Sequence, residues 1–357
     1  MIAALATLLI LATQSVAADH LRIAYFDSEL ARDGPGLLLR DIQRGDPQVA
    51  AVQAVIDRAG AEILLLAGID HDGAAQALSA LNAGLAEPYP HIAGLPGNAG
   101  IDSGLDLNGD GRRGTPHDMQ AWGRFSGQGA MALLSRHAID HDGIIDLTGL
   151  LWRDLPDSGI VDHNGQRGAA AKGADVLRLS TGGHWIVPLI LPGGGTLTLL
   201  AFRAGPPVFD GPEDRNGWRN RDEVLIWRHL LDGRLGPAPA PPLIVAGGAN
   251  LDPADGEGHR DAIRTLLSDP RLQDPRPATP GGSIAANAGH KGDPARDTVD
   301  WTDPVPGNLR VDYLLPSAGL RIRAAGGIWP PPDDPFAPTV TTASRHRLIW
   351  VDIALPD

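Results

Sequence analysis

The run Glu62-Ile63-Leu64-Leu65-Leu66-Ala67 is the stretch that decides the fold class. It is short, continuous and apolar, which is typical of a β-strand buried on both faces. The preceding residues 47–59 carry valine and isoleucine at helical spacing, with Asp46 as the N-cap and Gly60 at the end. Together these segments predict a helix that leads into a buried strand.

The same periodicities predict further strands and helices on both sides of this unit. Residues 21–26 alternate as a first strand, and residues 74–85 predict a second helix, so the chain opens strand-helix-strand-helix. Strands are also predicted at 131–134, 184–190, 196–201, 243–246, 310–315 and 348–352, with a helix at 220–231 and a long loop at 88–129. Two of these strands flank Gly193-Gly194-Gly195 and predict a hairpin. This mixture of hairpins and strand-helix units predicts the α+β class.

The composition limits the classes of protein to which the chain can belong. Of its 357 residues, 43% are hydrophobic, which is enough for a sizeable core in one domain. The formal net charge of -13 disfavours binding to bulk nucleic acid, because such a surface repels a phosphate backbone. The chain has no cysteine, so disulfides, thiol chemistry and Cys-ligated zinc are excluded.

The first 17 residues predict a signal peptide. Residues 1–12 are almost wholly apolar, and Ser15-Val16-Ala17 fits a small-x-small cleavage site before Ala18. The apolar run is too short to span a bilayer, and no other segment predicts a membrane span. We therefore expect an exported, periplasmic or extracellular monomer in which residues 18–357 form one domain. The alternative is that the first residues form a buried helix or strand.

Several stretches of the chain together resemble a known family. They are residues 36–42, 103–106, 130–136, 206–217, 310–313 and 344–348. Their order, from about Leu21 to Asp352, resembles the endonuclease/exonuclease/phosphatase superfamily with its deoxyribonuclease-I-like fold, and in particular a bacterial exported subgroup. The resemblance implies a four-layer α/β/β/α sandwich, in which two mixed β-sheets pack face to face between outer helices.

The resemblance also implies a metal-dependent phosphoric ester hydrolase. In that family a carboxylate holds a divalent cation such as Mg²⁺, an Asp activates the attacking water, and a His with an orienting Asp stabilises the phosphate. Three family positions are retained, as Asn250, Asp312 and His346. Five are replaced, with Asp27 for Asn, Gly68 for Glu, Arg203 for His, Gly248 for Asp and Arg345 for Asp.

These replacements predict that the family reaction is lost. Guanidinium groups near a metal position repel a divalent cation, so Mg²⁺ is disfavoured. The metal carboxylate and the general base act as a unit, so losing both leaves little catalysis. We therefore predict an inactive pseudoenzyme with an anion-binding pocket for a phosphate-bearing or other anionic small ligand. Its residues would be Arg203, Arg345, Asn250 and His346.

Two alternatives remain open for this site. In the first, the two arginines pair with Asp27 and Asp312 and form an inert polar plug. In the second, nearby carboxylates rebuild a rearranged metal site in an active phosphodiesterase or nuclease. The candidates for that site are Asp27, Glu29, Asp70 and Asp252.

A separate motif, Asp106-Leu107-Asn108-Gly109-Asp110-Gly111-Arg112, matches the first half of an EF-hand-type calcium loop. Its ligands would be the side chains of Asp106, Asn108 and Asp110 and the carbonyl of Arg112. Position 12 is a histidine, and Asp118 follows it. The motif predicts a Ca²⁺ site at 106–118 and, as a third class of function, a calcium-stabilised secreted interaction module. The alternative is a Gly-rich loop whose side chains cap their own backbone.

Overall fold

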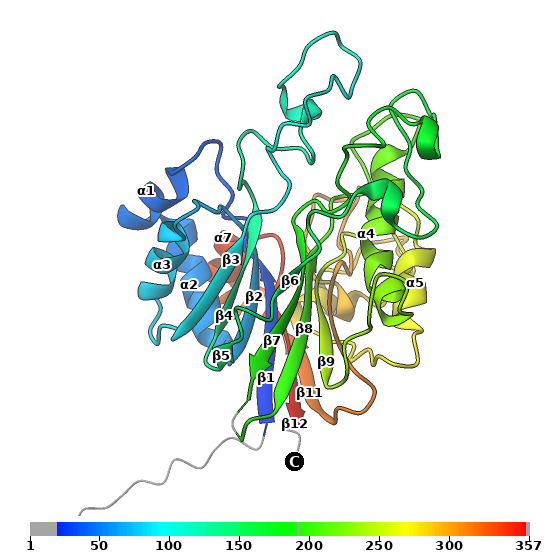
Figure 1. Ribbon diagram of the computed structural model, residues 1–357. Helices are drawn as coiled ribbons and strands as arrows, with labels where there is room; N and C mark the ends of the chain where they lie inside the picture. The colour runs from blue at the N-terminus through cyan, green and yellow to red at the C-terminus, as the bar shows by residue number, and fades with distance from the viewer. Residues whose placement is uncertain (1–19, 192, 355–357) are drawn as a thin grey trace, which may run out of the picture.

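The computed structural model describes residues 20–191 and 193–354, and Figure 1 shows β-sheets in its middle with helices on either side. The predicted signal peptide at residues 1–17 lies outside the described residues. Within the described part of the chain, no helix is both long and apolar enough to cross a membrane.

The first sheet is built on the segments that open the predicted fold, β1 (His20–Asp27) and β2 (Ile63–Ile69). These strands are parallel because the intervening helices return the chain to the same end of the sheet. The other neighbours are antiparallel, in the order β11-β12-β1-β2-β4-β3, so the sheet is mixed. The added strands are β3 (His91–Leu95), β4 (Ala130–Ser135), β11 (Ile322–Gly327) and β12 (Ile349–Ala354).

Helix α2 (Pro47–Ala59) has the predicted boundaries. The Asp46 side chain accepts hydrogen bonds from the backbone amides of Gln48 and Val49, which start the helix. Gly60 ends it in a left-handed conformation, with φ of 57°. The predicted apolar positions are buried against the first sheet, so the local sequence and the packing select the same helix.

The second sheet repeats this plan. Strands β8 (Thr196–Arg203) and β9 (Leu243–Gly248) are parallel and are joined through helix α4 (Arg215–Leu231). The strand order is β10-β9-β8-β7-β5, with β6 also paired to β7, and the remaining pairs are antiparallel. The other bounds are Ala138–Ile139 for β5, Ile145–Asp146 for β6, Gly183–Ile190 for β7 and Asp312–Pro316 for β10.

Three buried apolar clusters hold four layers together. One lies between the sheets, one between the first sheet and its helices, and one between the second sheet and helices α4 and α5. The other helices are α1 (Leu37–Gln43), α3 (Gln76–Ala83), α5 (Asp261–Leu267), α6 (Pro280–Ile284) and α7 (Ala337–Ala343). Short 3-10 turns are η1 (Pro116–Asp118), η2 (Trp152–Asp154), η3 (Gly168–Ala170) and η4 (Pro294–Arg296). The predicted four-layer α+β sandwich with two mixed sheets is confirmed.

The sequence analysis missed edge strands, the short helices α1, α5, α6 and α7, and the start of one longer helix. The predicted loop at 88–129 contains β3, which is half-buried throughout and therefore lacks a strong apolar signal. Strand β11 is a second edge strand that was missed. Helix α4 begins at Arg215 rather than at 220. The earlier start was missed because the first turn of the helix is polar.

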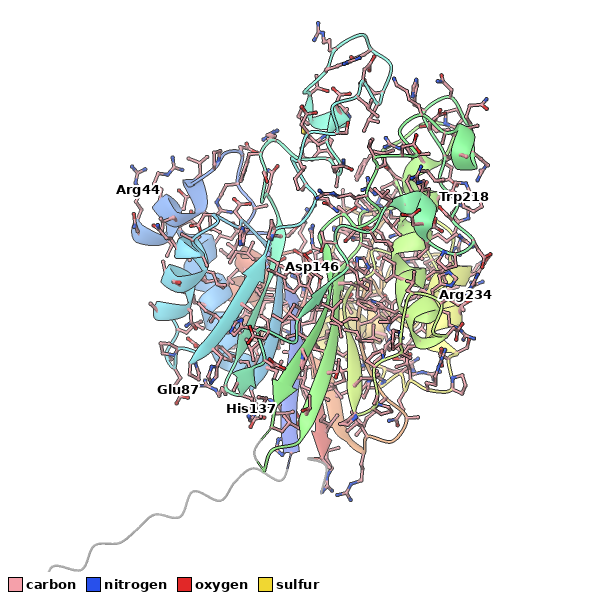
Figure 2. The ribbon with its side chains drawn as sticks, in the orientation of Figure 1. Arg44, Glu87, His137, Asp146, Trp218 and Arg234 are labelled. Carbon is pink, nitrogen blue, oxygen red and sulfur yellow. The ribbon has the colours of Figure 1, made fainter. Side chains whose placement is uncertain are left out.

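Long connections rise above one end of the sheets in Figure 1, the end at which β4 and β7 begin. They follow β3 and β6, and the second of them contacts the N-terminal half of α4 through Trp152 and Leu179. Figure 2 places Trp218 of α4 beside them, where the Arg167 guanidinium lies 4.3 Å from its ring centroid. The connections are thus packed onto the sandwich next to the strand ends that carry the site.

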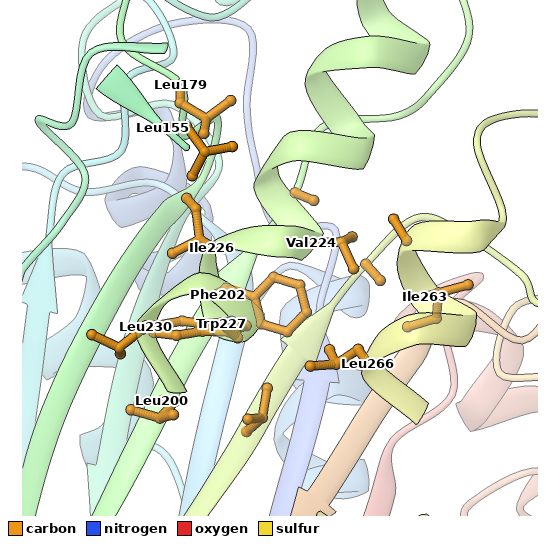
Figure 3. Close-up of a cluster of buried hydrophobic side chains, with 14 of the residues drawn as sticks. Leu155, Leu179, Leu200, Phe202, Val224, Ile226, Trp227, Leu230, Ile263 and Leu266 are labelled. Atoms are coloured by element: carbon orange, nitrogen blue, oxygen red, sulfur yellow. The ribbon is translucent and has the colours of Figure 1, made fainter. Parts of the chain in front are cut away.

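Figure 3 shows the cluster that joins the second sheet to α4 and α5. The rings of Phe202 and Trp227 meet edge-on, with centroids 6.1 Å apart and planes at 77°. Phe202 is fully buried and directly precedes Arg203 at the end of β8. This packing therefore fixes the strand end that carries the arginine.

Replacing Phe202 with alanine should lower the free energy of unfolding by about 3–5 kcal/mol, because a buried ring leaves a cavity. Phe209 is the matched control, since it is 88% exposed. Its replacement with alanine should change stability by no more than about 0.5 kcal/mol. Urea unfolding of both variants checks this, and equal losses would contradict the layer assignment.

Candidate functional site

Four of the five positions that the resemblance gives as replaced lie at one edge of the two sheets. Asp27 and Gly68 lie at the carboxyl ends of the parallel strands β1 and β2, and Arg203 and Gly248 lie at those of β8 and β9. Carboxyl ends of parallel strands share one edge of a sheet, which explains how positions far apart in sequence come together. The antiparallel pair Asp312 and Gly248 adds the start of β10 to the same edge.

An ion pair joins the two sheets across this edge. The Nε atom of Arg203 donates to Oδ2 of Asp27 at 2.7 Å, and the Asp27 side chain is 2% exposed. Burial opposes ionisation of Asp27, but Arg203 and His346 outweigh it and hold the pKa of this carboxyl below its ordinary value. Burial would lower the pKa of the Arg203 guanidinium, yet Asp27 raises it above the ordinary value. Both groups are therefore charged and paired.

Gly68 leaves room for this ion pair. It has φ of 68° at an irregularity in the pairing of β2 with β4. A Cβ atom there would overlap Oδ1 of Asp27 and would lie 2.9 Å from the backbone nitrogen of Glu29. A glutamate at position 68 is therefore incompatible with Asp27 in its present place.

The space beside Gly248 is likewise occupied, by a side chain from the other sheet. A Cβ atom at this position would lie 2.5 Å from the Tyr25 hydroxyl and 3.2 Å from Oδ1 of Asp312. Tyr25 is fully buried and points into the cluster between the sheets. Sequence reasoning missed its part in the site. The available signal was that Tyr25 precedes Asp27 by two residues and so shares its face of β1.

A second ion pair lies at the outer side of the site. Arg345 donates from its backbone nitrogen to Oε2 of Glu29 at 2.7 Å and from Nε to Oε1 at 2.9 Å. Burial alone would raise the pKa of Glu29, but the hydrogen bonds that Arg345 donates to it together outweigh burial and hold this pKa below its ordinary value. Arg345 thus pairs with Glu29 and not with Asp312, which corrects one partner in the predicted polar plug. Its side chain is 63% exposed.

His346 and Asp312, the pair that the resemblance gives as retained, lie together. Nδ1 of His346 lies 2.9 Å from Oδ2 of Asp312, and both side chains are buried. Trp301 meets the His346 ring edge-on, with centroids 5.8 Å apart. Burial alone would lower the pKa of His346, but the carboxylates of Asp312 and Asp27 raise it to about 9. His346 is therefore an imidazolium at neutral pH.

Asn250, the third position that the resemblance gives as retained, lies in the loop after β9 with φ of 49°. Its Nδ2 atom donates to the carbonyl of Ala204 at 2.8 Å. This bond ties the loop to the residue that follows Arg203. Asn250 therefore links the ends of β8 and β9, and its side-chain amide donates to the protein backbone.

The other candidate metal ligands are occupied by backbone. Asp70 accepts hydrogen bonds from the amides of Arg32 and Gly129, at 2.9 and 3.0 Å. Asp252 accepts three amide hydrogen bonds, one of them from Arg310 at 2.7 Å. Among the residues that the structure describes, no three His, Asp or Glu side chains are grouped so as to hold a metal ion. In the described part of the chain, the carboxylates suggested for a rearranged metal site therefore do not form a ligand cluster.

The predicted calcium loop has the geometry of a self-capped turn. Asp106 accepts hydrogen bonds from the amides of Gly109 and Gly111, and Asp110 accepts one from Arg112. The Asn108 side chain accepts a hydrogen bond from the amide of Asp110, and Lys172 Nζ donates to the carbonyl of Asp106. The two carboxylate oxygens of Asp118 accept hydrogen bonds from the amides of Leu107 and Thr115. Asp118 is buried in η1, and within the described ranges it forms no group of three acidic or histidine side chains that could hold a metal ion. These contacts match the alternative of side chains that cap their own backbone.

Comparison with known proteins gives one family. A model described as the Endonuclease/Exonuclease/phosphatase family matches residues 29–346. No curated relative matches the sequence.

Similar solved structures include an endonuclease/exonuclease/phosphatase from Beutenbergia cavernae DSM 12333, with 16% identity over 94% of this chain and 72% of that one, and a TM-score of 0.51. A family protein from Leptotrichia buccalis C-1013-b has 14% identity over 94% and 100%, with a TM-score of 0.51. Sphingomyelinase C from Streptomyces griseocarneus has 15% identity over 93% and 99%, with a TM-score of 0.52. At these identities the likeness concerns the fold.

The His346–Asp312 pair should make stability depend on pH. Because the folded-state pKa of His346 is raised to about 9, its contribution is fully present below the ordinary pKa of about 6.5 and is lost as the pH rises through about 9. The difference in unfolding free energy between wild type and His346→Gln should shrink by about 3 kcal/mol across this range.

Denaturant unfolding at several pH values measures this difference. Replacement of the exposed His141 with glutamine is the control and should leave the wild-type slope unchanged. An NMR titration that gave His346 a pKa at or below its ordinary value would contradict the pairing.

Proposed function

The chain belongs to the Endonuclease/Exonuclease/phosphatase family, and we propose that it is a member that does not hydrolyse phosphate esters. In this proposal the former metal site is a polar plug of paired charges that joins the two sheets. The protein then acts through its surface, as an exported binding or scaffolding protein. Export rests on the predicted signal peptide.

The Asp27–Arg203 ion pair is the observation that carries this proposal. It takes the space that a glutamate at position 68 would need. It also places a fixed positive charge beside the position where the resemblance implies a divalent cation. Such a charge repels a cation strongly at the low effective dielectric of a buried site.

The charges of the site also balance one another. Asp27 is paired with Arg203, Glu29 with Arg345, and Asp312 with His346. A metal ion would have to displace a guanidinium or an imidazolium from each carboxylate that it used. This balance argues against a rearranged metal site built from the same carboxylates.

The same pairing argues against the anion-binding pocket. Each of its four predicted residues already has a protein partner, as described above for Arg203, Arg345, Asn250 and His346. An incoming phosphate would compete with Asp27 and Glu29 and would meet their negative charge. The geometry therefore favours a plug over a pocket.

The purified protein should not turn over bis-nitrophenyl phosphate with magnesium, manganese or calcium. The reason is that the metal carboxylate and the general base are absent as a unit. His346→Ala is the matched control, because a contaminating hydrolase would give the same background rate in both preparations. A chelator-sensitive rate that is present in wild type and lost in His346→Ala would contradict the proposal.

Calorimetry with inorganic phosphate separates the plug from the pocket. The plug predicts no heat of binding. Heat that disappears in Arg203→Ala would favour the anion-binding pocket and overturn the plug.

A further inference from the structure

Residues 108–114 form the longest exposed segment of the described chain. Every residue in this segment is exposed, and all other runs of exposed residues in the ranges 20–191 and 193–354 are shorter. The connection from β3 to β4 contains this segment and rises above the end of the sandwich in Figure 1. Arg112 and Arg113 lie here, between Gly111 and Gly114. A protein that approaches this end of the molecule would therefore meet two neighbouring arginines.

The side chains of these two arginines can be bound by a partner. Among the described residues, neither guanidinium group forms an ion pair or a hydrogen bond. Exposed arginines elsewhere are paired with carboxylates, as Arg40 is with Asp41. An enzyme pocket that selects arginine does so with a carboxylate, which pairs with the guanidinium group. Residues 112 and 113 can enter such a pocket without first breaking a contact of their own side chains.

The backbone at Arg113 and Gly114 is equally accessible. A protease binds its substrate as an extended segment through main-chain hydrogen bonds, so the backbone groups of that segment must be exposed. Within the described ranges, no hydrogen bond involves the backbone of Arg113 or Gly114. The amide of Arg112 donates to Oδ1 of Asp110 at 2.8 Å, and this contact is exposed. The segment can therefore enter an active site while the sandwich stays folded.

The chain contains two other Arg-Gly bonds, and the backbone holds both of them. The amide of Gly45 donates to the carbonyl of Ile42 at 3.1 Å, just past the end of α1. The amide of Gly168 donates to the carbonyl of Ile160 at 3.0 Å. The three bonds are alike in sequence, but the structure distinguishes the one after residue 113.

Both ends of this loop are anchored below the arginines. The amide of Leu107, a buried residue, donates to Oδ1 of Asp118 at 2.8 Å. The other carboxylate oxygen of Asp118 accepts a hydrogen bond from the amide of Thr115 at 3.0 Å. Residues 101–103 also pair with residues 118–120 through backbone hydrogen bonds of 2.7 and 3.2 Å. A break in the chain between residues 112 and 114 therefore leaves each new end tied to the protein.

We propose that residues 112–114 are a processing site for an endoprotease that cleaves after arginine. At the Arg113-Gly114 bond, the hydroxyl of a water molecule is added to the carbonyl carbon and its hydrogen to the glycine nitrogen. The product is a two-chain form in which the sandwich is intact. The carboxylates of Asp106 and Asp110 flank the arginines and disfavour a phosphate or another anion as the ligand of this surface. The proposal does not depend on whether the edge of the sheets hydrolyses phosphate esters.

Limited proteolysis of the full protein with trypsin tests the site. The first cut should fall after Arg112 or Arg113, and mass spectrometry of the two fragments identifies it. The fragments should elute together in size-exclusion chromatography under native conditions. In the double variant Arg112→Gln, Arg113→Gln the first cut should be slower by about tenfold or more, because the remaining basic residues lie in more strongly held backbone.

Arg167→Gln is the matched control, since Arg167 is also exposed and also precedes a glycine. This variant should be cut first at residues 112–113, at the wild-type rate. A first cut anywhere else in wild type, after Arg44 or Arg167 for example, would overturn the processing site. An unchanged rate in the double variant would do the same. Fragments that separate without denaturant would contradict the two-chain form.

Discussion

The ion pair between Asp27 and Arg203 is the contact on which the rest of the site depends. It connects β1 of one sheet to β8 of the other at the edge where the parallel strands end. A buried ion pair stabilises a protein only when its geometry repays the cost of desolvation. Here the buried Phe202 anchors the end of β8 next to Arg203, and Gly68, which has no side chain, leaves room for Asp27. The missing side chain at position 68 and the carboxylate at position 27 are thus sterically linked.

The charged side chains of the site are ordered and paired with one another. Tyr25 occupies the space beside Gly248, and the pairing of Glu29 with Arg345 adds an outer link to the loop before β12. Asp312 and His346 are paired, and the Thr298 hydroxyl oxygen accepts a hydrogen bond from the backbone amide of Asp312. Asp27, Glu29 and Asp312 are thus each paired with a positively charged side chain of the protein.

Much of the fold could be predicted because its central strands are buried on both faces and read as continuous apolar runs. Edge strands such as β3 were missed, since half-buried residues carry little periodic signal. The meeting of Asp27, Gly68, Arg203 and Gly248 could be predicted from the resemblance. The partner of Arg345 could not, because Glu29 reaches it from a loop in a left-handed conformation, with φ of 49°. Tyr25 was hidden for a different reason, since its position also fits an ordinary core residue.

The central claim is that paired side chains close this site to a metal ion, and bound Mn²⁺ tests it most directly. Crystals soaked in millimolar Mn²⁺ can be measured for anomalous scattering at the edge where β1, β8 and β9 end. The ion pairs predict no manganese peak near Asp27, Asp312 or Asn250, and an unbroken contact between Asp27 and Arg203. A manganese ion coordinated by Asp27 or Asp312, with Arg203 turned away, would contradict the account.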